Sequence, residues 1–138
     1  MNERLSESIK AHTIFVYGTL KPGGRYHDYI RDMVENPRNG TVKGELYDYY
    51  GKFPVLKPGE DANERVQGVM YHVKSEFTES IVHLLDQIEG YPMLFDRNWL
   101  SVTLNGRPPQ YAAALTYFGN DPALFDYGII KEGVWFNT

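Results

Sequence analysis

Residues 15–24 read FVYGTLKPGG, a strand that runs directly into a glycine turn. The β-branched and aromatic residues from His12 to Val16 are typical of a strand. Gly18 allows the backbone to adopt a positive φ or to approach another group closely, and Lys21–Gly24 favours a turn that ends the strand. Backbone N–H groups in such a loop can point outward and bind a carboxylate or an oxyanion. The alternative is a buried strand followed by an ordinary surface turn.

Hydrophobic spacing divides the rest of the chain into short elements. We expect strands near residues 12–18, 41–50, 53–56, 65–73, 99–104 and 111–117, and helical segments near 26–34 and 75–89. Asn36–Gly40 is expected to end the first helical segment, Ser75 to cap the second, and Gly90 to follow its last residue. The tail from Asn120 is expected to be irregular, with a helix start at Asp121-Pro122.

Length and element order indicate one α+β domain. The chain has 138 residues, of which 42% are hydrophobic, so it can form a substantial core. The strands do not alternate with long helices, which argues against a doubly wound sheet and for a closed or curled, mostly antiparallel one. We therefore expect a single domain over residues 1–138, of which residues 1–11 form a polar arm.

Composition excludes several classes of function. The net charge is −4 and there is no basic run, so nucleic acid is not an expected partner. The absence of cysteine excludes disulfides, a thiol nucleophile and cysteine metal ligands, and the spacing of the histidines fits no zinc site. No segment approaches the roughly 18 apolar residues of a membrane span. The polar N-terminus does not resemble a signal peptide, so we expect a cytoplasmic protein.

Glu89 is the candidate catalytic residue. It lies beside the apolar stripe of the expected helix and is that helix's last residue before Gly90. A carboxylate at a helix C-terminus faces the negative end of the dipole. That position, together with partial burial, raises a carboxyl pKa and favours a general base. The alternative is a solvated glutamate before a C-cap glycine.

The order of these motifs resembles the gamma-glutamylcyclotransferase-like superfamily. Tyr17–Lys21, followed by Leu85–Gly90 and then Phe95–Arg97, looks most like its gamma-glutamylamine cyclotransferase and AIG2-like branch. The similarity continues in four further segments, namely Gly44–Tyr47, Phe53–Val55, Val66–Tyr71 and Gly133–Trp135. It therefore extends over about residues 12–136.

The resemblance implies a fold, a site and a reaction. The fold is a small mixed, mostly antiparallel β-barrel with flanking helices and a pocket at its mouth. Glu89 would be the catalytic residue, and the substrate would be bound by Tyr17, Gly18, Thr19, Leu20 and Tyr117. A gamma-glutamyl compound would cyclise to 5-oxoproline with release of its amine half, without a metal or other cofactor. A binding module without catalysis and a deacylase of a gamma-glutamyl natural product remain alternatives.

Several other residues receive provisional roles. Arg97 is expected to pair with a carboxylate, either structurally or at the pocket rim. Arg25, Tyr26 and His27 are expected to face the leaving amine as an open edge that tolerates substrates of different size, and His27 is a candidate substrate contact. Trp135 is expected to be a structural plug.

Overall fold

The structure, a computed structural model, describes residues 9–60 and 63–136. Its strands are β1 (Thr13–Val16), β2 (Val34–Tyr49), β3 (Phe53–Pro58), β4 (Arg65–Val73), β5 (Phe95–Leu104), β6 (Gln110–Gly119) and β7 (Ile129–Ile130). The helix α1 (Ser80–Glu89) is accompanied by the short 3-10 turns η2 (His27–Tyr29), η3 (Arg31–Met33), η4 (Ser75–Phe77) and η5 (Pro122–Phe125). No helix in the described ranges has the length and apolarity needed to cross a membrane.

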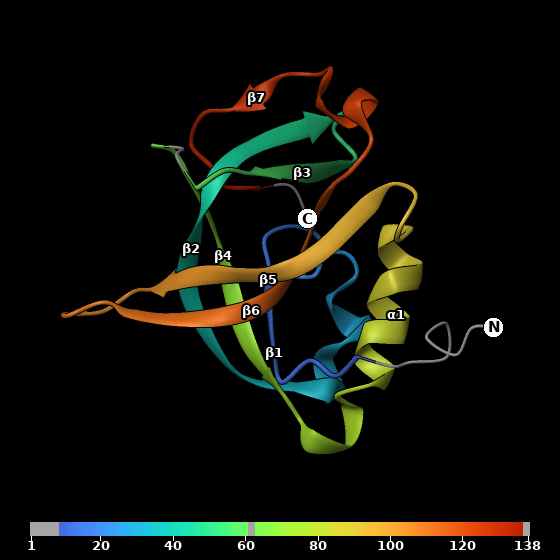
Figure 1. Ribbon diagram of the computed structural model, residues 1–138, viewed down its shortest axis with the longest axis vertical. Helices are drawn as coiled ribbons and strands as arrows, with labels where there is room; N and C mark the ends of the chain where they lie inside the picture. The colour runs from blue at the N-terminus through green and yellow to red at the C-terminus, as the bar shows by residue number, and fades with distance from the viewer. Residues whose placement is uncertain (1–8, 61–62, 137–138) are drawn as a thin grey trace.

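The strands close into a barrel. They follow the order β3-β2-β4-β1-β6-β5, and β2 also pairs with β5, which completes the ring (Figure 1). Closure occurs at Gly40, opposite Leu104, where a Cβ would lie only 2.8 Å from the Thr103 carbonyl oxygen. A glycine is needed there because two backbones approach closely. The β1–β6 pair is parallel and the others are antiparallel, so the expected mixed, mostly antiparallel α+β barrel is confirmed.

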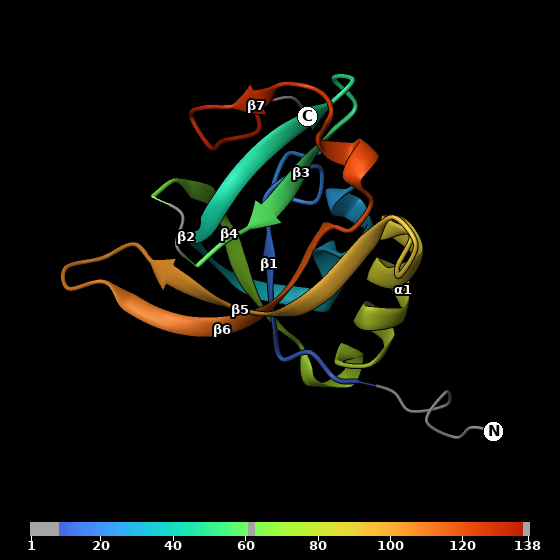
Figure 2. The ribbon, with the colours of Figure 1, turned by 45° about the horizontal axis from the view of Figure 1, so that its top comes forward.

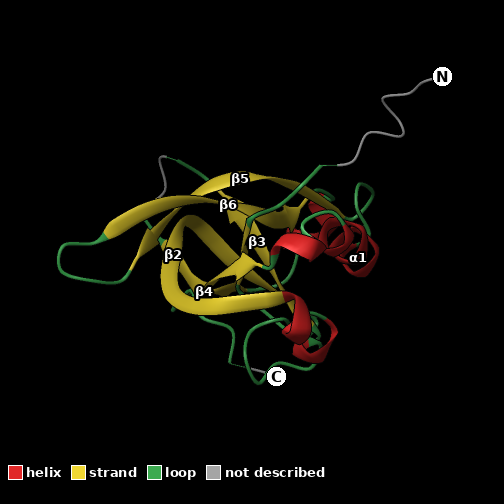
Figure 3. Ribbon diagram, turned by 90° about the horizontal axis from the view of Figure 1, so that it is seen from below, coloured by secondary structure: helices red, strands yellow, loops and turns green. Residues whose placement is uncertain are grey.

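The expectation that Asn36–Gly40 ends a helical segment is wrong, because these residues lie within β2. Instead of ending a helical segment, these residues form part of a strand that pairs with β4 on both sides of an irregularity between Glu35 and Arg38. Asn36 absorbs the irregularity with a φ of 57°, a conformation that asparagine tolerates better than most residues. The turn-forming residues thus mark a bulge that bends the strand. Figure 3 shows β2 curling around the barrel.

The helical segments are shorter than expected. The segment expected as a helix over 26–34 contains the two 3-10 turns η2 and η3, and its last residue, Val34, already belongs to β2. The segment expected as one helix from Ser75 divides into η4 and α1. Ser75 is therefore not the cap of α1, whose N-cap is Glu79. Gly90 does end α1, with a φ of 66°. Asp121 caps η5, as expected, by accepting a hydrogen bond from the Ala123 N–H at 3.0 Å.

The core on the helix side of the barrel fixes where α1 lies. Ile81 and Leu85 of α1 are buried against Ile14 of β1 and Leu115 of β6. The protruding end of the β5–β6 hairpin points away from α1, while the other end of that hairpin lies beside it (Figures 1 and 2). Residues 1–8 of the expected polar arm lie outside the described residues, but Ala11 is fully buried.

A second group of buried residues fills the other part of the barrel. Phe15, Val66 and Val102 belong to it, and so does Trp135, which is 3% exposed. The Trp135 carbonyl oxygen accepts a hydrogen bond from Lys21 Nζ at 2.7 Å, which ties the C-terminal segment to the loop after β1. Trp135 therefore packs as the expected structural plug.

Candidate active site

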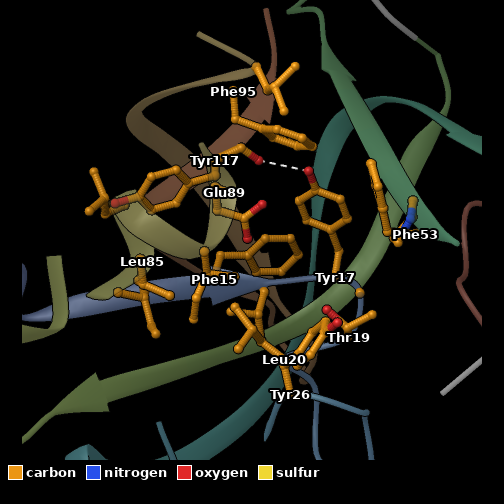
Figure 4. A pocket seen from close by; sticks show the side chains of 17 residues that line it. Phe15, Tyr17, Thr19, Leu20, Tyr26, Phe53, Leu85, Glu89, Phe95 and Tyr117 are labelled. Atoms are coloured by element: carbon orange, nitrogen blue, oxygen red, sulfur yellow. Dashed lines mark hydrogen bonds between the residues drawn. The ribbon is translucent and has the colours of Figure 1, made fainter. Parts of the chain in front are cut away.

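A pocket opens where the end of β1 faces the C-terminal end of α1. Its volume is about 160 Å³. The residues predicted to form the site all line it, namely Tyr17, Gly18, Thr19, Leu20, Glu89 and Tyr117 (Figure 4). The fold therefore brings together residues that are more than 60 positions apart in the sequence. Two segments that the sequence did not assign to the site complete its walls, Phe53-Pro54 of β3 and Leu94-Phe95 at the start of β5.

Glu89 is the acidic residue of the pocket wall. It is the last residue of α1, it is half-buried, and its neighbours in the wall include the apolar Leu85 and Ile88. Burial raises the pKa of Glu89 from 4.5 to about 7. No hydrogen bond or ion pair from residues 9–60 or 63–136 reaches its carboxylate. A carboxyl group with a pKa near neutrality can accept a proton and return it.

The loop after β1 is held by its carbonyl groups. The Gly18 oxygen accepts from the Lys21 N–H at 3.0 Å, and the Thr19 oxygen accepts from the Tyr26 N–H at 2.9 Å. The Leu20 oxygen lies 3.0 Å from Nδ1 of His27. No hydrogen bond within the described parts of the chain uses the N–H groups of Gly18, Thr19 or Leu20. These donors therefore remain available to a ligand in the pocket that they line.

Gly18 is required by close packing rather than by a left-handed backbone. It is absent from the glycines of positive φ, so that alternative does not apply. A Cβ at this position would lie 2.6 Å from Cγ of Pro54, well inside contact distance. The missing side chain lets β3 approach the loop, which places Pro54 and its neighbour Phe53 in the pocket wall.

The hydroxyl groups of both site tyrosines are bound to the protein. Tyr17 donates to the Tyr117 carbonyl oxygen at 2.7 Å and accepts from the Leu56 N–H at 3.2 Å. Tyr117 donates to Oδ1 of Asp86 at 2.6 Å. Burial, and after it the charge of Glu89, raise the pKa of Tyr17, so this phenol stays neutral and its oxygen lies in the field of the carboxylate. The two tyrosine rings line the pocket, and the hydrogen bonds of their hydroxyl groups fix the rings in place.

Asp86 is an important residue to which sequence reasoning gave no role. It lies one turn before Glu89 on α1, and both of its carboxylate oxygens accept from the same Arg97 nitrogen at 2.9 Å. The Arg97 guanidinium also lies over the Tyr91 ring, 3.8 Å from its centre. The expected pairing of Arg97 with a carboxylate is confirmed. The signal for Asp86 was its i, i+3 spacing from Glu89, which places both residues on one helix face.

Of the edge expected to face the leaving amine, only Tyr26 lines the pocket. His27 lies behind the loop, next to Leu20 and 6.0 Å from the Tyr71 ring centre. Arg25 has its guanidinium over the Tyr26 ring, 5.8 Å from the centre. Within the described residues no group of three or more potential ligands could hold a metal ion.

The barrel, the loop and the helix-terminal glutamate define a class of proteins, and comparison with known proteins supports the same assignment. A family model described as "Gamma-glutamyl cyclotransferase, AIG2-like" matches residues 14–137. This chain belongs to that family, as the order of its motifs indicated.

Two curated relatives are similar over part of their length. The chain is 31% identical over 99 residues to a gamma-L-glutamyl-butirosin B gamma-glutamyl cyclotransferase of Niallia circulans, covering 67% of this chain and 59% of that protein. It is 30% identical over 101 residues to the gamma-glutamylaminecyclotransferase of Homo sapiens, covering 66% of this chain and 61% of that one. The matched region thus spans about three fifths of each relative's length.

Solved structures share the fold. An AIG2-like protein of Mus musculus superimposes with a TM-score of 0.70 at 23% identity, over 94% of this chain and 97% of that one. YkqA of Bacillus subtilis gives a TM-score of 0.67 at 20% identity, over 91% of this chain and 39% of that one.

Proposed function

We propose that this chain is a cofactor-free gamma-glutamyl cyclotransferase, which converts a gamma-glutamyl amide into 5-oxoproline and a free amine. The observation that carries the proposal is the position of Glu89, a carboxylate of raised pKa in an apolar pocket, across from a loop with available N–H donors. Family membership supports the same activity.

In the proposed reaction Glu89 first removes a proton from the substrate's α-ammonium group. The freed amine attacks the side-chain carbonyl carbon and closes a five-membered ring, leaving a negative charge on the carbonyl oxygen. The bond to the leaving nitrogen then breaks as Glu89 returns the proton to that nitrogen. The ring nitrogen still carries a second proton, which passes through the Glu89 carboxylate to the released amine, so that the lactam is neutral and the amine departs as an ammonium ion. Atoms balance without water or a co-reactant, and Glu89 ends in its starting state.

The loop N–H groups of Gly18, Thr19 and Leu20 would bind the α-carboxylate and stabilise the oxyanion. A single donor aimed at a developing oxyanion contributes about 3–4 kcal/mol in acyl-transfer enzymes. Ring closure is intramolecular, and well-oriented reactions of this type reach effective molarities on the order of 10⁵–10⁸ M. A site with one proton-transfer group and a few donors can therefore suffice, because its main task is to fold the substrate.

The test is incubation with gamma-glutamyl amides and dipeptides, with mass detection of the products. Release of 5-oxoproline by the wild-type chain but not by Glu89→Gln supports the proposal. Release of free glutamate instead would identify a deacylase, since hydrolysis consumes water and leaves the chain of the glutamyl group open. Binding of the substrates without any product would identify a binding module.

A further inference from the structure

The walls of the pocket carry very little charge. Among the described residues that line it, Glu89 is the sole acidic one, and there is no lysine, arginine or histidine. The loop N–H groups and Glu89 account for the α-carboxylate and the α-ammonium group of the glutamyl half, but a further carboxylate would find no cation in this lining and a further ammonium group no second carboxylate. Burying an unpaired charge is costly. The lining therefore selects against a charged group on the amine half of the substrate.

The volume of the pocket limits which part of the substrate it encloses. About 160 Å³ is close to the volume of an engineered cavity of about 150 Å³ that binds benzene, so the pocket encloses a group of about that size, such as a glutamyl group. The amine half must then lie against the rim. Because the proposed proton return is from Glu89 to the leaving nitrogen, the amine half lies near the C-terminus of α1.

The most exposed of the described lining residues are apolar or aromatic. Leu94 follows Gly90 in a turn closed by a hydrogen bond of 2.9 Å between the Leu94 N–H and the Gly90 oxygen, and it is 45% exposed. Tyr26, on the loop side, is 38% exposed and stacks on Tyr29. Phe53, from β3, is half-buried in the wall. Exposed apolar residues at the mouth of a pocket are favourable for an apolar ligand and unfavourable for water.

Aromatic rings continue from the pocket to the surface. Phe53 lies 6.2 Å from Phe95 in the pocket and 5.0 Å from Tyr49, centre to centre. Tyr49 contacts Tyr50 at 4.6 Å, and Tyr50 contacts Tyr127 at 3.8 Å. Tyr50 and Tyr127 are 56% and 47% exposed. A continuous row of rings thus leads outward from the enclosed part of the site.

We propose that the amine half of the substrate is uncharged and apolar or aromatic, and that it binds against Leu94, Tyr26 and Phe53. This proposal rests on the proposed cyclotransferase function and narrows it. It replaces the expectation of an open edge that tolerates substrates of different size, because the three rim residues offer apolar and aromatic surface. The guanidinium of Arg25 lies over the Tyr26 ring, 5.8 Å from its centre, so the glycine conjugate tests whether that cation attracts an anionic amine half.

The test compares gamma-glutamyl benzylamide with gamma-glutamyl ethanolamide, whose amines have similar basicity, and with the conjugates of putrescine and glycine. We expect kcat/KM for the benzylamide to exceed that for the other three by about 10-fold or more, from burial of the ring. Equal values, or a preference for a charged conjugate, would overturn this proposal and leave the cyclotransferase function standing.

Binding separates the two proposals if no conjugate yields 5-oxoproline. That result would reject the cyclotransferase function, while calorimetry with the wild-type chain and with Glu89→Gln would still test the rim. We expect the benzylamide to bind about 10-fold more tightly than the ethanolamide, and equal affinities would overturn the apolar subsite.

A negative charge introduced at Leu94 should shift the preference among substrates toward a conjugate whose amine half is positively charged. Leu94→Asp should raise the ratio of kcat/KM for the putrescine conjugate to that for the benzylamide by about 10-fold. Leu94→Asn has the same shape without the charge and should raise it much less. Any general effect on Glu89 cancels in a ratio of two substrates. An unchanged ratio in Leu94→Asp would show that the amine half lies elsewhere.

Discussion

Helix α1 carries two carboxylates one turn apart, and their surroundings differ sharply. Asp86 is paired with Arg97, accepts a hydrogen bond from Tyr117, and keeps a side-chain exposure of 25%. Glu89 faces an apolar pocket without a partner from the described residues, and its pKa is raised to about 7. One carboxylate fixes the helix to the barrel, while the other stays available for chemistry.

The difference follows from which strands lie beside each residue. Asp86 faces the β5–β6 pair near the start of β5, where Arg97 and Tyr117 are cross-strand neighbours. Glu89 lies beyond it, at the open end where the loop after β1 leaves space for a ligand. Arg97 would be a largely buried charge without a partner if Asp86 were removed, so this pair serves the structure. A desolvated carboxyl with a shifted pKa, by contrast, indicates a functional site.

The largest effect should come from Glu89→Gln. The amide keeps the shape of the side chain but cannot accept the proton, so turnover should fall by about 10²–10⁴-fold. Rates of 5-oxoproline release on a confirmed substrate measure it, with circular dichroism to show that the fold is retained. Near wild-type turnover in a pure preparation would show that Glu89 is not the base.

The pH dependence of kcat/KM should reflect the ionisation of Glu89. Because the base must be ionised, kcat/KM should fall about ten-fold per pH unit below pH 7 and level off above it, following the pKa of Glu89 at about 7. A pH–rate series from pH 5 to pH 9 provides the measurement. A midpoint near 4.5, the ordinary value for glutamate, would mean that the reacting carboxyl is not desolvated.

Asp86→Asn should affect the stability of the fold more strongly than it affects turnover. It leaves Arg97, which is 15% exposed, without its counter-charge, so the free energy of unfolding should fall by about 1–3 kcal/mol. Turnover should fall by less than in Glu89→Gln, because the pocket wall loosens but the base remains. Denaturant unfolding gives the first quantity and steady-state kinetics the second.

Glu79→Gln is the matched control for Asp86→Asn. Glu79 is an exposed carboxylate at the other end of the same helix, so its removal should change stability by no more than about 0.5 kcal/mol. If Asp86→Asn is equally silent, the cluster with Arg97 and Tyr117 does not anchor α1.

Local patterns in the sequence predicted those elements whose residues act on their immediate neighbours. Gly90 ends α1 because a left-handed residue favours glycine, and the alternation in residues 65–73 identified β4. The prediction at Asn36–Gly40 was wrong because the residue types that form turns also form bulges in strands. The pairing of β2 with β4 determines that a bulge forms here. Glu89 could be recognised from its place at a helix end, whereas the role of Asp86 required knowledge of which strand brings Arg97 beside it.

The last effect concerns the stability of the fold as a function of pH, and its sign distinguishes the two carboxylates. The folded-state pKa of Glu89, about 7, lies above its ordinary value of 4.5, so the folded chain binds this proton more tightly than the unfolded chain does. Stability from the protonated group is fully present below pH 4.5 and is lost as the pH rises through 7. Glu89→Gln removes that loss. The variant should therefore gain about 1–3 kcal/mol relative to wild type between pH 5 and pH 8.

Thermal unfolding of the wild-type chain, Glu89→Gln and Asp86→Asn at those two pH values measures the difference. The melting temperature of Glu89→Gln should rise relative to wild type as the pH rises, because a buried base that favours chemistry reduces stability once it is ionised. Asp86→Asn should remain below wild type at both pH values. If Glu89→Gln instead loses stability relative to wild type at pH 8, the Glu89 carboxylate is stabilised in the folded chain, and the contrast between the two ends of this helix turn does not hold.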